Sequence, residues 1–189
     1  MSGKTTITVD RDIALRFSKA SREHGISALR LASDSLELAI EALRYGYSPK
    51  RLQLLLKMAI SLDTEDVFPV PIHLLSSIFE EIGLSRFKVE FYEAGKSLGT
   101  LLSVSIKFHE LVQDPLMFKQ ILPIRNATCN IKTNNCDIHL AFPPSAKPLM
   151  ELFASYIRGL LDGYSISNHR VQVKENVLEI YIENYPLPT

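Results

Sequence analysis

The part of the sequence that most limits how this chain can fold is a short polar–apolar alternation near its start. Residues 6–9 read Thr-Ile-Thr-Val, which is typical of a strand with one buried face. An isolated strand of this length has no stability of its own. The helical pattern that begins at Asp10 offers no neighbouring strand, so we expect residues 5–9 to pair with a second copy of the chain.

Two capped helices are predicted to follow the strand. Asp10 is a suitable N-cap for a first helix that ends at Gly25, and Ser27 is placed to cap a second helix. Apolar residues recur at helical spacing along both helices: Ile13, Phe17, Ala20, Leu29, Ala32, Leu36, Ala39, Ile40 and Leu43. A unit this small buries too little surface to fold as a monomer. Two copies with antiparallel strands would share one core, with Ile7 and Val9 facing it.

The opposite face of such paired strands would be polar. By the two-residue period of a strand, Lys4, Thr6 and Thr8 project away from the core. A two-stranded ribbon fits the major groove of B-DNA, where lysine and threonine can contact base edges. Up to Arg51, nine basic and six acidic residues give a net charge of +3, and the remainder carries −3. This asymmetry is compatible with an anionic partner for the N-terminal segment.

Residues 3–45 resemble the ribbon-helix-helix family of DNA-binding proteins, the class of the Arc, MetJ and CopG repressors. The resemblance rests on TTITVD and on the helices RDIALRFSKASREHG and ISALRLASDSLELAIEAL. It implies an obligate homodimer whose base contacts come from Lys4, Thr6 and Thr8. Many family members carry a more basic or amide-rich strand triplet, so two threonines imply weaker base readout.

Phosphate contacts are expected at two helix starts. The resemblance implies that the backbone near Ser27 and Ala28 holds a phosphate, since a helix N-terminus is an anion site. We expect Arg11 to hold a phosphate as well. Two alternatives stay open for this segment: a pure dimerisation module built on the same fold, and an unrelated helical start.

The rest of the chain is predicted to form helices and two hairpins. Tyr45-Gly46 is expected to close the second helix, and GYSPKRL reads as a hinge in which Ser48 caps a connecting helix that begins at Pro49. The later pattern predicts, in order, helices over 73–83 and 88–112, a hairpin around Asn134-Asn135, a helix over 149–161 and a hairpin around Glu175-Asn176. We therefore expect an α+β fold in three parts: a ribbon-helix-helix unit over 1–46, a connecting helix or linker over 47–66, and an α+β regulatory or assembly domain over 67–189.

Two glycine pairs stand four residues apart in predicted helices. Gly95 and Gly99 lie in YEAGKSLG, and Gly159 and Gly163 lie in YIRGLLDG. Small residues at this spacing let two helices approach closely, which we take as their structural role.

The order of helices and hairpins over 67–184 resembles the vinyl-reductase-like domains, which are small-molecule-binding modules. The resemblance implies a ligand pocket, which we expect between the helix containing Tyr92 and the helix containing Tyr156. The cysteine-rich metal pattern of that family is absent from this sequence, so we expect no metal.

Cys129 and Cys136 are the two cysteines of the chain. A turn at Asn134-Asn135 would pair Ile131 with Ile138 and Cys129 with Leu140, which puts the cysteines about 13 Å apart along the hairpin. That separation is too long for a disulfide. We therefore expect structural thiols, with a metal-ligand or redox role as the alternative.

Several function classes have no sequence support. The chain carries no phosphate-binding glycine loop, no HExxH and no GxSxG motif, so we expect neither an enzyme nor a cofactor. Its apolar runs are too short for a membrane span, and two cysteines suit the cytoplasm.

We predict a sequence-specific, double-stranded DNA-binding transcriptional regulator. It would act as a homodimer that can assemble further and can bind a small-molecule effector. The alternative is a small-molecule-binding or scaffold protein that uses its N-terminal unit only to dimerise.

Overall fold

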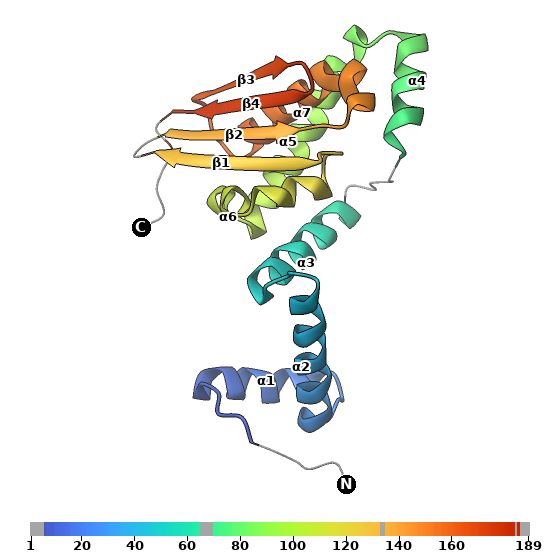
Figure 1. Ribbon diagram of the computed structural model, residues 1–189. Helices are drawn as coiled ribbons and strands as arrows, with labels where there is room; N and C mark the ends of the chain where they lie inside the picture. Colours follow the sequence, from blue (N-terminus) through green and yellow to red (C-terminus); the bar gives the residue numbers. More distant parts are fainter. Residues whose placement is uncertain (1–5, 65–69, 133–134, 184, 186–189) are drawn as a thin grey trace. The chain divides into compact units, whose positions relative to one another are not determined.

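The computed structural model describes residues 6–64, 70–132, 135–183 and 185 (Figure 1). The chain divides into two compact units, Met1–Leu52 and Gln53–Thr189. Helices predominate, and the described residues form one four-stranded antiparallel sheet, which confirms the predicted α+β class. No described helix combines the length and the apolar character that crossing a bilayer requires.

The first unit contains α1 (Arg11–Glu23), α2 (Ala28–Arg44) and the first residues of α3 (Pro49–Thr64). Asp10 Oδ1 accepts from the Asp12 amide at 2.9 Å, and Ser27 Oγ accepts from the Arg30 amide at 3.2 Å. Both side chains therefore cap the helices as the sequence predicted. Gly25 follows α1 with φ +65°, a conformation that glycine adopts without steric cost.

The strand predicted before α1 is not seen in the single described chain. Residues 6–10 have no regular secondary structure in the single described chain, and none of the described strands pairs with them. The strand predicted over 5–9 is therefore not formed within one chain, and residue 5 lies outside the described residues. A ladder requires a partner strand, so one chain alone has nothing with which to form it.

The second unit packs a helix pair against one face of the sheet. Its neighbouring strands, in order, are β1 (Asn126–Lys132), β2 (Asn135–Ala141), β4 (Val177–Ile182) and β3 (His169–Lys174). Helices α5 (Lys88–Ser105) and α7 (Met150–Gly163) lie behind this sheet in Figure 1. The inward positions of the two central strands are buried: Cys136, Ile138, Leu140, Leu178, Ile180 and Ile182.

Helix α3 also contributes to this second unit. Its residues from Gln53 onward belong to the unit, and Leu54 and Met58 are buried in the main core. Lys57 Nζ donates to the Ser105 carbonyl at 2.7 Å, where a cation satisfies a free carbonyl at the C-terminus of α5. The described part of the segment expected as a connection over 47–66 thus consists mainly of α3, whose later part contributes to the core.

Shorter elements complete the second unit: α4 (Ile72–Ile82), η1 (Ser85–Phe87), α6 (Phe108–Gln113), η2 (Pro115–Gln120) and η3 (Pro144–Leu149). The single helix predicted over 88–112 is wrong, because α5 ends at Ser105. Ile106 is extended and fully buried, so the break delivers an apolar side chain to the core. Helix α6 then starts afresh, with the Lys107 amide donating to Glu110 at 2.9 Å.

The register of the first hairpin also differs from the prediction. Lys132 pairs with Asn135, Ile131 with Cys136, and Cys129 with Ile138. The expected Ile131–Ile138 and Cys129–Leu140 pairs are therefore wrong by two residues. The second hairpin turns at Glu175-Asn176 as predicted, since Lys174 pairs with Val177.

The four glycines of the two helices lie where the backbones of α5 and α7 come into close contact. A Cβ on Gly95 would overlap the Tyr156 carbonyl, and one on Gly159 would overlap the Tyr92 carbonyl. A Cβ on Gly99 would overlap the backbone of Leu160, and one on Gly163 would overlap the backbone of α5. The predicted close-packing role is confirmed, because any side chain at these positions would separate α5 from α7.

We predict that Gly159→Ala destabilises the protein. The added methyl group would clash with backbone atoms of α5, which cannot rotate away as a side chain can. We therefore expect a net loss of roughly 1–3 kcal/mol in the free energy of unfolding. This loss should appear although alanine favours helix by about 1 kcal/mol over glycine. Denaturant unfolding followed by circular dichroism measures it. Glu93→Ala, at an exposed position of α5, is the control and should change little; equal stability of Gly159→Ala and wild type would contradict the tight crossing.

Candidate nucleic-acid interface

The first unit exposes most of its large apolar side chains. Among the described residues 6–52, only Ser21 and Ala42 are buried. Ile7 is 59% exposed and Leu29 is 65% exposed. The same holds for Val9, Ile13, Leu15, Leu36, Leu38, Ile40 and Leu43. An apolar surface of this extent is typical of an interaction site.

Helix α2 carries the densest part of this surface. Leu36 and Ile40 line a shallow groove of about 560 Å³ together with Ser33, Glu37, Glu41 and Arg44. Both apolar residues belong to the stripe that the sequence predicts for this helix. The groove therefore has an apolar centre and charged edges, as an interface core with a polar rim does.

The predicted base-contacting residues lie before α1. Thr6 and Thr8 are exposed, and Lys4 lies outside the described residues. Ile7 and Val9 alternate with the threonines and are exposed as well, so the single chain does not distinguish the two faces of this segment. Pairing with another strand is what would separate them.

The predicted phosphate-contacting residues lie at two helix starts. Arg11 is the first residue of α1, and Ala28 is the first residue of α2; both are exposed. Ser27 uses its hydroxyl to accept from the Arg30 amide, and its carbonyl accepts from the Leu31 amide at 3.0 Å. The amides of Ala28 and its neighbour have no acceptor within the helix, because a first turn has none. They carry the positive end of the helix dipole.

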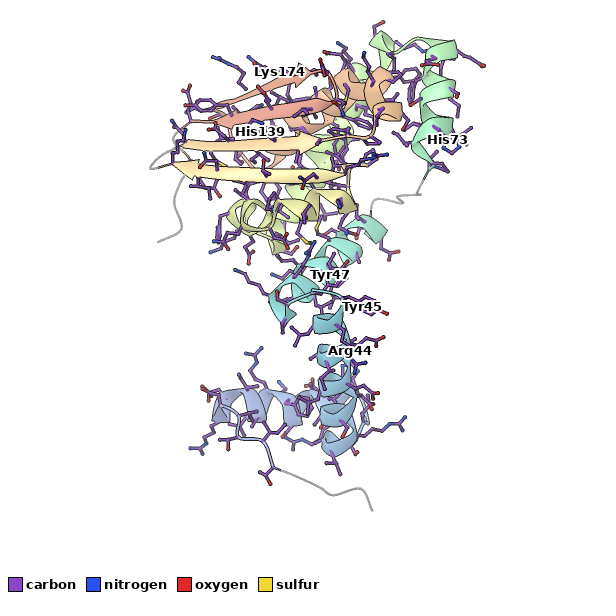
Figure 2. The ribbon with its side chains drawn as sticks, in the orientation of Figure 1. Arg44, Tyr45, Tyr47, His73, His139 and Lys174 are labelled. Carbon is purple, nitrogen blue, oxygen red and sulfur yellow. The ribbon has the colours of Figure 1, made fainter. Side chains whose placement is uncertain are left out.

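The end of α2 presents an Arg-Tyr-Gly-Tyr run for which the sequence predicted a helix end and a hinge but no binding role. Figure 2 labels Arg44, Tyr45 and Tyr47 there, and Tyr45 is 74% exposed. The Arg51 guanidinium lies over the Tyr47 ring, 4.9 Å from its centroid. In the sequence, two tyrosines beside basic residues could have indicated this cluster, because aromatic residues and arginine are enriched at interfaces.

The two tyrosines predicted to line a ligand pocket occupy the α5–α7 crossing. Tyr92 donates a hydrogen bond of 2.6 Å to Asp162 Oδ2, and this bond raises the pKa of Tyr92. Backbone contact at Gly95 and Gly159 fills the space beside Tyr92 and Tyr156. The pockets described on the second unit are lined by other residues. The pocket at these tyrosines therefore remains a prediction without a described cavity.

The outer face of the sheet is polar. Figure 2 labels His139 on this face, opposite the buried cysteine side, as the strand alternation predicted. A hollow of about 300 Å³ there is lined by Asp137, His139, Arg170, Gln172, Glu179, Ile180 and Tyr181. Across the paired strands, Glu179 lies between His139 and Gln172, and Tyr181 lies between Asp137 and Arg170. We therefore interpret this hollow as part of a solvent-exposed surface that carries both acidic and basic side chains.

Comparison with known proteins adds no family to these observations. No family model matches the chain, and the search of curated proteins returns no match. The case for a function therefore rests on the exposed apolar residues of the first unit, its capped helices and its basic charge.

Proposed function

We propose that the protein is a homodimeric, sequence-specific double-stranded DNA-binding regulator of transcription that acts in the cytoplasm. The observation that carries the proposal is the composition of the first unit: an alternating segment and two capped helices whose large apolar residues are mostly exposed. A unit of about 50 residues with two buried side chains needs a partner to become stable.

A second copy of the chain is the partner that the first unit suits. Residues 6–9 alternate as a strand does but have no ladder partner among the described residues. Two identical segments can pair antiparallel about a two-fold axis, which is the commonest symmetry of homo-oligomers. Such pairing would turn Ile7 and Val9 to one side, where the exposed stripes of the helices could cover them.

DNA is the ligand that the opposite face of this ribbon favours. Thr6 and Thr8 would lie outward with Lys4, and a paired ribbon is narrow enough for the major groove. Arg11 and the α2 N-terminus at Ser27 offer positive charge on the same unit, whose net charge to Arg51 is +3. Contacts to phosphate would fix the position of the ribbon, and the strand side chains would read bases.

The second unit supports a separate role in the same protein. It has its own continuous core and its own sheet, so its folding does not depend on the exposed residues of the first unit. We propose that it serves regulation or assembly, through an effector or through contacts between dimers.

We predict that Ile7→Asp dissociates the dimer. Each dimer would bury two unpaired carboxylates in the shared core, so self-association should weaken at least about a hundredfold. Thr8→Asp is the matched control, because it places the same charge on the neighbouring, outward position. Sedimentation equilibrium of the full chain measures both variants. A dimer of unchanged affinity in Ile7→Asp, or a folded wild-type monomer at micromolar concentration, would contradict this assembly.

We predict that replacing both Thr6 and Thr8 by alanine weakens specific DNA binding. Each base contact contributes roughly 1–3 kcal/mol at most, hydroxyl contacts are weak, and each change occurs twice, so we expect about a tenfold to several-hundredfold loss. Arg11→Ala should weaken binding to all sequences alike and flatten the salt dependence, because it removes phosphate contacts. Fluorescence anisotropy against the duplex that the wild type binds best, and against a scrambled duplex, separates the two effects.

Circular dichroism and sedimentation must first show that the double alanine variant is folded and dimeric. If it then binds the specific duplex as tightly as the wild type, the ribbon is not the reading element. If the wild type itself binds no duplex DNA at low salt, the unit serves dimerisation only, in a small-molecule-binding or scaffold protein.

A further inference from the structure

The corrected hairpin register brings the two cysteines together. Cys129 on β1 pairs with Ile138, and Cys136 on β2 pairs with Ile131, so the cysteines are diagonal neighbours on the same face. Their sulfur atoms lie 3.3 Å apart, and both are free thiols. A disulfide needs about 2.05 Å between sulfurs. Side-chain rotation and a small strand adjustment can supply the remaining approach.

The two thiols differ in access to solvent and in acidity. Cys129 is half-buried on the edge strand β1, whereas Cys136 is completely buried on the interior strand β2. A hydrogen bond from the Cys136 thiol lowers the pKa of Cys129. The same bond, together with burial, raises the pKa of Cys136. Because the thiolate is the reactive form, Cys129 is the thiol that an oxidant in solution can reach and modify.

The surroundings favour two thiols over a metal centre. Across the described ranges, no three His, Cys, Asp or Glu side chains are grouped so that they could hold a metal ion. Nearby Tyr185 is 3% exposed, and its hydroxyl has no hydrogen-bond partner within the described structure. Burial, and then the charge of the two cysteines, raises the pKa of Tyr185. The interior side of the pair is therefore closed to solvent, and a small oxidant approaches from the side of Cys129.

We propose that Cys129 and Cys136 are an oxidation site that closes into an intrachain disulfide when the protein meets a peroxide. The Cys129 thiolate attacks one peroxide oxygen, the O–O bond breaks, and Cys129 becomes a sulfenic acid while the other oxygen leaves as water after taking a proton. Cys136 then loses its thiol proton and attacks the Cys129 sulfur, and the sulfenic hydroxyl leaves as a second water. One hydrogen peroxide is reduced to two waters, and two thiols are oxidised to one disulfide.

The bond would change the mobility of one part of the sheet. Among the described strands, β1 lies at the edge of the sheet and pairs with β2 alone, whereas β2 also pairs with β4. A covalent link from Cys129 to Cys136 would tie this edge strand to its neighbour and restrict local opening. Amide hydrogen exchange reports such opening directly.

The test treats the full-length, fully reduced protein with hydrogen peroxide at a low molar ratio. Intact mass should fall by two hydrogens with no added oxygen, both cysteines should stop reacting with a maleimide after denaturation, and dithiothreitol should reverse both changes. Amide exchange in β1 should slow at least several-fold in the oxidised protein. Glutathione treated in parallel shows that the oxidant is active.

Single variants separate the roles of the two thiols. Cys136→Ser should let peroxide convert Cys129 to a sulfenic acid that a dimedone probe captures. Cys129→Ser should leave Cys136 as a free thiol that reacts at least about tenfold more slowly. Cys136→Ala replaces Cys136→Ser if circular dichroism shows that the hydroxyl disturbs the core.

Three outcomes would overturn the proposal. The wild type could keep two maleimide-reactive thiols under conditions that oxidise glutathione. Oxidation could yield only disulfides between chains, seen as a reducible dimer on a denaturing gel. Cys129→Ser could react with peroxide as fast as the wild type, which would show that Cys129 is not the thiol attacked.

Discussion

The second unit depends on the direct backbone contact between α5 and α7. Gly95 and Gly99 on one helix, and Gly159 and Gly163 on the other, carry no side chain, and at each of them one helix contacts the backbone of the other. The neighbouring large residues then reach the sheet from a closely packed pair of helices: Leu98, Leu102, Leu152, Phe153, Ile157, Leu160 and Leu161 are all buried. Dispersion contacts fall steeply with distance, so separating the helices would loosen this whole layer.

The two units differ in what each can do alone. Most large apolar residues of the second unit lie in one core that both helices and the sheet share, although a few, such as Leu56, Val89 and Val104, are exposed. The first unit has regular, capped helices but almost no buried side chains. Local signals such as Asp10 and Ser27 can set helix boundaries without tertiary contacts. They cannot provide a core, and this is the physical reason why we propose that the first unit forms an assembly of two chains.

Sequence patterns predicted the features that local chemistry controls. The helix caps, the glycine pairs and the second hairpin are as expected. The first hairpin was wrong by two residues, because a two-residue shift keeps every side chain on its original face and the apolar pattern cannot detect it. The error concealed the closeness of Cys129 and Cys136. The break at Ile106 carries no proline or glycine and follows from tertiary burial, which no local signal encodes.

The candidate interface was predicted in part. Ser27 and Ala28 lie at a helix start, as expected. Which way the Thr6 and Thr8 side chains point depends on pairing with the strand of a second chain. DNA binding by the double alanine variant therefore tests this orientation. Tyr45 was overlooked because its predicted place at the end of the second helix indicates a helix boundary and, by itself, no binding role.

The most direct measurement is selection of bound fragments from a random duplex DNA library by the full-length protein, followed by sequencing. A two-fold symmetric ribbon reads two half-sites related by the same axis, so the binding site should mirror the symmetry of the protein. The account predicts enrichment of an inverted repeat whose half-sites lose information when Thr6 and Thr8 are replaced by alanine. Failure to enrich any motif, or enrichment of a motif without two-fold symmetry, would contradict it.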